Sequence, residues 1–107
     1  MRKVFHRVAA HDAVVPGTGI PVVAGGENDC VLFRTIEGAY HATGALCPHQ
    51  NEPLDRGRLE GREVVCRRHH LRFDLASGAC TNAGGFDLRT FEVRVESDGV
   101  YIGVWED

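Results

Sequence analysis

The chain has 107 residues, a formal net charge of −3, 43% hydrophobic residues and 25% charged residues. These values suit one small folded domain, and they predict a single domain over residues 1–107. The mildly acidic balance disfavours a nucleic-acid-binding protein, because such proteins are usually basic. No apolar run approaches the roughly 20 residues that a membrane-spanning helix needs. The charged first six residues lack the apolar stretch of a secretory signal, so we expect a cytoplasmic protein.

Short apolar runs separated by glycine predict an all-β fold built of antiparallel strands. The 13 glycines exceed the usual share of about 7%, which favours many turns. Two Pro and two Gly predict a loop over residues 14–21, because they cannot propagate a helix. Glu37-Gly38 predicts a tight hairpin turn. In chain order, we expect strands at residues 4–8, 30–36, 39–43, 91–96 and 100–104.

The last two predicted strands carry the clearest periodicity. Phe91, Val93 and Val95 alternate with charged residues. Residues 100–104 then repeat the alternation after a turn at residues 97–99. Alternation of this kind predicts strands with one buried face and one solvent-exposed face.

The middle of the chain, residues 45–73, has no clear helical or strand period. Two short pieces, residues 57–60 and 63–66, could pair around Gly61. Residues 56–72 hold six Arg against two Glu, whereas residues 73–107 hold two Arg against seven acidic residues. The basic segment is either a solvated loop surface or a docking patch for an acidic partner.

The same segment holds Cys and His at ligand spacing. Without a signal peptide, metal ligation is a better default for the four cysteines than disulfides. Cys47-Pro48-His49 and Cys66-Arg67-Arg68-His69 are separated by sixteen residues, and each offers one thiolate and one imidazole. Either a tetrahedral zinc ion or a [2Fe–2S] cluster could use such a set. Because each half carries one ligand of each kind, the pattern favours the cluster. The remaining residues of these two types are expected to have ordinary structural roles: Cys30, Cys80, His6, His11, His41 and His70.

This C-x-H…C-x-x-H pattern resembles the Rieske [2Fe–2S] motif. The resemblance extends to Phe73-Asp74, to Gly78 and to the closing strands. It implies a Rieske fold, with a base of antiparallel strands and a smaller cluster-binding lobe at about residues 45–76. It also implies that Cys47 and Cys66 bind one iron while His49 and His69 bind the other. His69, rather than His70, has the family's offset from Cys66, and the family usually has Gly at the position of His70.

The details of the motif resemble the lower-potential branch of the family. Respiratory members add a disulfide between the two ligand loops, but here the matching positions are Asn51 or Gln50 and Arg68. Their hydroxyl-bearing positions correspond to Leu71 and Phe73, and fewer hydrogen bonds to sulfur lower a cluster's potential. The third loop, residues 80–85, lacks the proline that is usual in the family.

The resemblance therefore implies a monomeric Rieske ferredoxin, an electron-transfer component rather than an enzyme. It would carry one electron from a flavin-dependent reductase to a terminal, ring-hydroxylating-type oxygenase. The alternatives are a Rieske-like small subunit of a nitrite reductase or other oxidoreductase and, more distantly, a structural zinc module. A Rieske domain within an oxygenase would need a catalytic iron domain, for which 107 residues leave no room.

Overall fold

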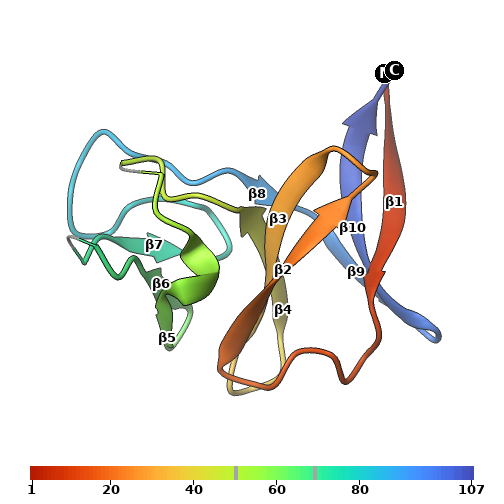
Figure 1. Ribbon diagram of the computed structural model, residues 1–107, viewed down its shortest axis with the longest axis horizontal. Coiled ribbons are helices and arrows are strands. Elements are labelled where there is room, and N and C mark those ends of the chain that lie inside the picture. Colours follow the sequence, from red (N-terminus) through yellow and green to blue (C-terminus); the bar gives the residue numbers. More distant parts are fainter. Residues whose placement is uncertain (50, 69) are drawn as a thin grey trace.

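The computed structural model describes residues 1–49, 51–68 and 70–107. In that part the chain is almost entirely β, with antiparallel pairing throughout the named strands and one short 3-10 helix (Figure 1). The predicted all-β class is therefore confirmed. Among the described residues, no helix is long and apolar enough to cross a membrane.

Two sheets form what we call the base. The first has the order β1-β10-β9, and its strands are Arg2–Ala9 (β1), Gly99–Glu106 (β10) and Val93–Glu96 (β9). The second has the order β2-β3-β4-β8, and its strands are Thr18–Ala24, Asn28–Arg34, Tyr40–Gly44 and Thr90–Phe91. Both chain termini lie at one end of the base, far from the third sheet (Figure 1).

The third sheet belongs to a lobe, which we define as residues 45–88. It follows the 3-10 helix Leu54–Arg56, has the order β5-β6-β7, and contains the strands Arg58–Glu60, Glu63–Val65 and Arg72–Asp74. The predicted pairing around Gly61 is confirmed, because β5 and β6 form an antiparallel hairpin there. The third strand, β7, was not expected from the sequence, because three residues are too few to show a period.

The central strand β3 connects the base to the lobe. Its Cys30 and Leu32 belong to a core between the two base sheets, together with Val100, Ile102 and other residues. Its Val31 and Phe33 face the opposite way, into a second core beneath the lobe. Side chains alternate between the faces of a strand, so β3 is buried on both faces and holds the lobe against the base.

The predicted loop over residues 14–21 is wrong in its second half, where β2 begins at Thr18. β2 is an edge strand, and proline is tolerated at an edge because its missing N–H need not face a neighbouring strand. Gly19 in β2 lies against the ring of Phe33, and a Cβ at this position would come within 2.5 Å of that ring. Gly19 and Pro21, which suggested a loop in the sequence, are thus accommodated within β2 by the tertiary structure.

The predicted strand over residues 91–96 is divided between the two base sheets. Phe91 in β8 pairs with β4, whereas Val93 in β9 pairs with β10. The expected buried face is also wrong at Val95, which is 54% exposed. The alternation at residues 100–104 is confirmed by the burial of Val100, Ile102 and Val104. The predicted turn at Glu37-Gly38 is confirmed by the hydrogen bond from the Gly38 N–H to the Thr35 carbonyl.

Candidate metal centre

The two cysteine-containing loops are closed by the same device. The Cys47 N–H donates to the carbonyl of Glu52 over 2.8 Å, and the Cys66 N–H donates to the carbonyl of Leu71 over 2.8 Å. Each bond spans five residues. The second loop connects β6 to β7 directly, and a bridge between Leu46 and Pro53 flanks the first. Both loops are therefore hairpin tips, each with a cysteine at its entrance.

Each loop also has a left-handed residue four positions after its cysteine. Asn51 has φ 55° and His70 has φ 56°. Glycine adopts this conformation freely, asparagine adopts it at small cost, and other residues at greater cost. The loop geometry thus gives a physical reason why glycine suits the position of His70. In this chain a histidine carries that strain.

The structure brings the thiols of Cys47 and Cys66 together. The two residues are 0% and 2% exposed and belong to the core beneath the lobe. Burial raises the pKa of the Cys66 thiol, the N–H of Arg68 lowers it, and the adjacent Cys47 thiol raises it. If both sulfurs were thiolates, their negative charges would repel each other. A metal that binds both sulfurs would offset this repulsion. The donor set of two buried, adjacent thiols therefore fits a metal centre.

Of the two histidines in the predicted ligand set, the structure describes only His49. His49 is partly buried, and its ring meets the ring of Phe86 edge to face, with centroids 4.9 Å apart. His69 lies outside the described residues. Within residues 1–49, 51–68 and 70–107, no three Cys, His, Asp or Glu side chains gather at one point that could hold a metal ion.

A third segment, after β7, packs on both ligand loops. The side chain of Asn82 donates to the carbonyl of His70 over 3.0 Å and accepts from the N–H of Arg72 over 3.0 Å. From the same segment, Phe86 contacts His49. Sequence reasoning missed Asn82 and Phe86, because neither stands at a spacing that marks a role. Together these contacts hold the segment, which has no proline at residues 80–85, against the two loops.

The residues after the second loop form a tight turn. The Asp74 carboxylate accepts the N–H groups of Ala76 and Ser77 at 2.8 and 2.9 Å. These donors, Ser77 foremost, hold the pKa of Asp74 below its usual range. Gly78 has φ 80°, and a Cβ there would lie 2.0 Å from the carbonyl oxygen of Leu88. The sequence pattern of Asp74 and Gly78 is thus explained by a turn that returns the chain toward β8.

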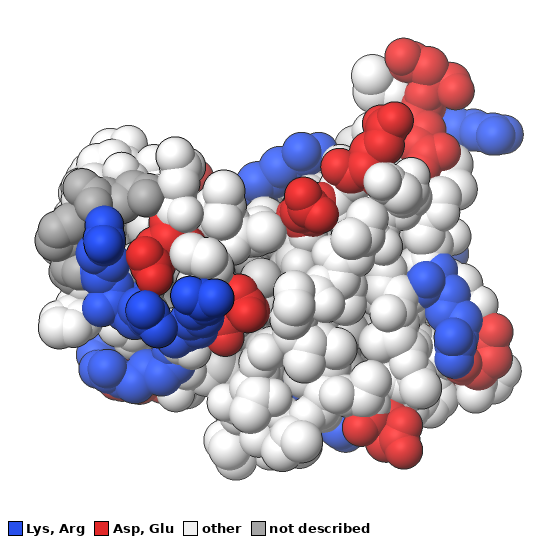
Figure 2. All heavy atoms as spheres, in the orientation of Figure 1, with Lys and Arg blue, Asp and Glu red and all other residues white. Residues whose placement is uncertain are grey.

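Positive side chains gather on the lobe with some negative ones among them (Figure 2). Five of the six arginines in residues 56–72 are exposed. Arg72 forms ion pairs with Glu60 at 2.6 Å and with Glu63 at 3.3 Å. Arg67 and Arg68 both pair with Glu52, which lies outside the segment counted in the sequence. The lobe is therefore less positive than the sequence count indicates, although its exposed groups are mainly guanidinium.

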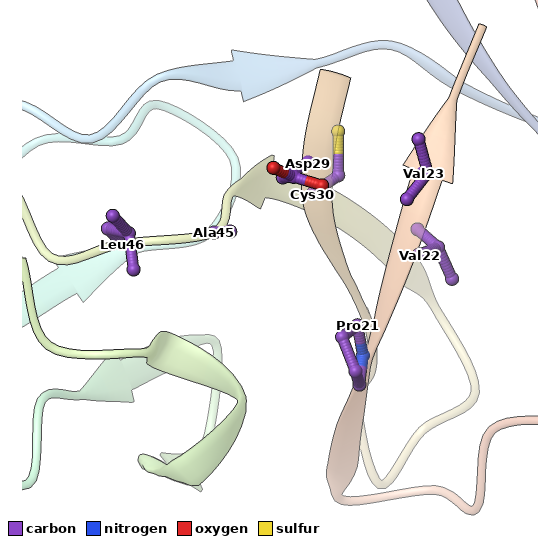
Figure 3. A pocket seen from close by; sticks show the side chains of 7 residues that line it. All are labelled: Pro21, Val22, Val23, Asp29, Cys30, Ala45 and Leu46. Carbon is purple, nitrogen blue, oxygen red and sulfur yellow. The ribbon is translucent and has the colours of Figure 1, made fainter. Parts of the chain in front are cut away.

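A hollow of about 500 Å³ separates β2 from the first ligand loop (Figure 3). Leu46, next to Cys47, lines its lobe side, and Val22 and Val23 line its base side. Among the lining residues only Asp29 is charged. The lining is therefore mainly apolar, with the Asp29 carboxylate and the Cys30 thiol as its polar side chains.

The remaining cysteines and histidines lie outside the pair of buried thiols, and the Cys80 thiol donates to Oδ1 of Asn82 over 3.6 Å. Cys30 and Cys80 are free thiols, and burial raises the pKa of Cys30 to about 11. The raised pKa disfavours the reactive thiolate at neutral pH, as expected for a structural role. Nε2 of His6 lies 2.5 Å from a carboxylate oxygen of Glu106, on the neighbouring strand of the first sheet. Burial, with a contribution from Arg62, lowers the pKa of His41.

Comparison with known protein families gives one match over most of the chain. The family described as Rieske [2Fe-2S] domain matches residues 5–92. This segment contains both cysteine-containing loops and the turn at Gly78.

Several curated proteins have similar sequences. The ferredoxin component of a naphthalene 1,2-dioxygenase system from Pseudomonas putida is 37% identical over 101 residues, which are 94% of each chain. The ferredoxin component of the alkene monooxygenase system of Xanthobacter autotrophicus is 34% identical over 79 residues, 73% of this chain and 64% of that protein. Apoptosis-inducing factor 3 of Homo sapiens is 36% identical over 73 residues, which are 12% of its length.

Two solved structures illustrate the likeness in fold. A complex of oxygenase and ferredoxin in carbazole 1,9a-dioxygenase contains a chain with TM-score 0.79 and 27% identity, covering 91% of this chain and 99% of that one. An NADH-dependent nitrite reductase small subunit described for Mycobacterium tuberculosis has TM-score 0.91 and 23% identity, with full coverage of both chains. At that identity, the second likeness shows the fold alone.

Proposed function

The chain belongs to the Rieske [2Fe–2S] domain family, whose cofactor is a [2Fe–2S] cluster, and from this premise we propose that it is a ferredoxin. It carries one electron at a time from a flavin-dependent reductase to a terminal oxygenase of the ring-hydroxylating type. The observation that supports this most directly is the pair of equivalent hairpin loops, which bury Cys47 and Cys66 side by side. The ferredoxin components of oxygenase systems that match up to 94% of this chain support the same assignment.

We assign Cys47 and Cys66 to one iron and His49 and His69 to the other. Two ferric ions, two sulfides, two thiolates and two neutral imidazoles sum to zero charge, so one-electron reduction adds a single negative charge. The protein supplies the positions of the four ligands and a low-dielectric setting for the thiolates. His49 lies nearer the surface than the buried thiols, so the histidine side of the centre is where we place electron exchange with a partner.

We propose a carrier role rather than catalysis. The hollow beside Leu46 is lined mainly by apolar side chains and carries one charged residue. A carrier needs only a centre near the surface and a face that partners can reach. We also propose that the protein acts as a monomer in the cytoplasm, where its free thiols stay reduced.

The exposed arginines of the lobe form the docking face in this proposal. Charge reversal at Arg56 and Arg62 tests it without touching the residues that contact Glu52. We expect slower electron transfer to an oxygenase at low ionic strength, with the difference disappearing at high salt. The matched control is Arg2→Glu, at the start of β1 beside the N-terminus, which lies far from the lobe (Figure 1). A rate that is unchanged and independent of salt would remove the docking face from the proposal.

The cofactor and the function are tested on the purified full chain. We expect two irons and two sulfides per chain, visible absorption, uptake of one electron from dithionite and a Rieske-type paramagnetic resonance after reduction. Electron transfer is then measured with the reductase and oxygenase components of a naphthalene dioxygenase system. Zinc without iron or sulfide would overturn the ferredoxin assignment in favour of a structural module. An intact cluster that exchanges electrons only with a nitrite reductase would favour the alternative role as a subunit.

A further inference from the structure

One carboxylate joins the two ligand loops. Glu52 closes the first loop, and its side chain is only 14% exposed. Its Oε1 lies 3.1 Å from Nε of Arg67, and its Oε2 lies 3.6 Å from Nε of Arg68. Both arginines belong to the second loop and directly follow Cys66, and their side chains are 57% and 58% exposed. Each oxygen of one acidic group thus holds a different residue of the opposite loop.

Burial of the Glu52 carboxylate costs solvation free energy, which its two arginine partners offset. A carboxylate that is mostly removed from water needs compensating charge, and two guanidinium groups supply it. The arginines are the exposed members, so they approach Glu52 from the solvent side and cover it. The backbone of Glu52 is held as well, because its carbonyl accepts the Cys47 N–H. Movement of the Glu52 side chain would therefore act on both cysteine-containing loops.

We propose that Glu52 is a positioning residue that clamps the second ligand loop against the first and lowers the reduction potential of the centre. This inference rests on the proposed ligand set. The clamp works through geometry, because it fixes the segment that follows Cys66. The effect on the potential works through charge, because an added electron is disfavoured by a nearby carboxylate and favoured by nearby guanidinium groups.

The chain offers a matched control in Glu60. This residue also pairs with two arginines, Arg58 at 2.5 Å and Arg72 at 2.6 Å. Its partners lie within the β5-β6-β7 sheet and do not connect the two ligand loops. Glu60→Gln therefore removes the same charge from the lobe and disturbs two ion pairs, but leaves the connection between the loops intact.

The test measures two properties of the cluster-loaded protein, the rate of iron release to a chelator and the midpoint potential. We expect Glu52→Gln to release iron about tenfold faster than the unmodified chain, as expected for loss of a charged contact. We expect the potential to rise, because a negative charge is lost. The double variant Arg67→Gln/Arg68→Gln breaks the same clamp from the other side. It should also release iron faster, but its potential should fall. Glu60→Gln should keep the original rate of iron release.

If the two clamp variants both release iron faster while their potentials shift in opposite directions, faster release follows from loss of the clamp. A purely electrostatic effect would not speed iron release in both. If Glu52→Gln releases iron no faster than Glu60→Gln, the clamp is overturned. If the potential does not change in opposite directions in the two clamp variants, the effect on the potential is overturned. Absence of iron and sulfide from the unmodified chain would instead overturn the ferredoxin assignment, so the two failures are distinguishable.

Discussion

The base and the lobe are both built from antiparallel strands, but different interactions hold them together. In the base, β1 and β10 have eight residues each and pair from Arg2 with Glu106 to Ala9 with Val100. In the lobe, each strand has three residues. The base core is almost wholly aliphatic, whereas the lobe core includes the side chains of Cys47 and Cys66.

This difference shows where the protein depends on its cofactor. Long paired strands over an apolar core are stabilised by burial and by ladder hydrogen bonds. Short strands that end in loops have fewer such interactions, so cross-links between the loops contribute a larger share of their stability. We therefore expect the base to stay folded without a metal and the lobe to depend on the metal. The following changes test this contrast.

The largest effect is expected from Cys66→Ser. In the proposed ligand set, this change removes one ligand and with it the cross-link between the loops. We expect colourless protein whose lobe amides exchange rapidly with solvent, while amides of β1 and β10 stay protected. Hydrogen exchange and visible absorption measure both outcomes. Cys80→Ser is the control, because this partly exposed thiol lies outside the ligand loops. If the lobe amides stay protected in colourless Cys66→Ser protein, the lobe does not depend on the cluster more than the base does.

Gly78→Ala should destabilise the lobe without touching a ligand. The new Cβ would lie 2.0 Å from the Leu88 carbonyl oxygen, on a backbone with φ 80°. We expect a loss of about 3 kcal/mol in the free energy of unfolding. Gly84→Ala is the matched control, because no atom lies within 4 Å of the Cβ that it would add. Equal denaturation midpoints for the two variants would show that the turn at Gly78 can relax.

Asp74→Ala should destabilise the same turn and make its stability less dependent on pH. The carboxylate accepts two backbone N–H groups, and loss of these contacts should cost about 1.5 kcal/mol at neutral pH. Because folding lowers the pKa of Asp74, this stabilisation is present above the pKa of the unfolded chain. It is lost as pH falls through the lower pKa of the folded protein. Chemical denaturation at pH 7 and at acidic pH should show the variant and the original converging on acidification.

His70→Gly should stabilise the second loop by about 1 kcal/mol, because glycine adopts the left-handed backbone without strain. Asn51→Gly, at the equivalent position of the first loop, is the internal comparison. It should have a smaller effect, since the short side chain of asparagine can hydrogen-bond locally at φ 55° and so lowers the cost of the left-handed backbone. Thermal denaturation of the cluster-loaded variants measures the difference. A larger gain from Asn51→Gly would show that the two loops are not equivalent.

The sequence was most informative where the pattern is local. Alternation at residues 100–104 predicted a strand with a buried face, and the burial of Val100 and Ile102 confirms it. It was less informative where one segment serves two sheets. Residues 91–96 look like one strand, but Phe91 and Val93 pair with different neighbours. Period alone cannot show which partner a residue will have.

By itself, the sequence determined the all-β class, the family and the candidate ligands Cys47, His49, Cys66 and His69, because strand period and ligand spacing are properties of short segments. Only the tertiary structure decided how the centre is supported. It placed Glu52 between Arg67 and Arg68, and it set Asn82 and Phe86 against the ligand loops. These contacts join segments that are distant in the chain, and their partners depend on how the lobe packs on β3 rather than on any local pattern.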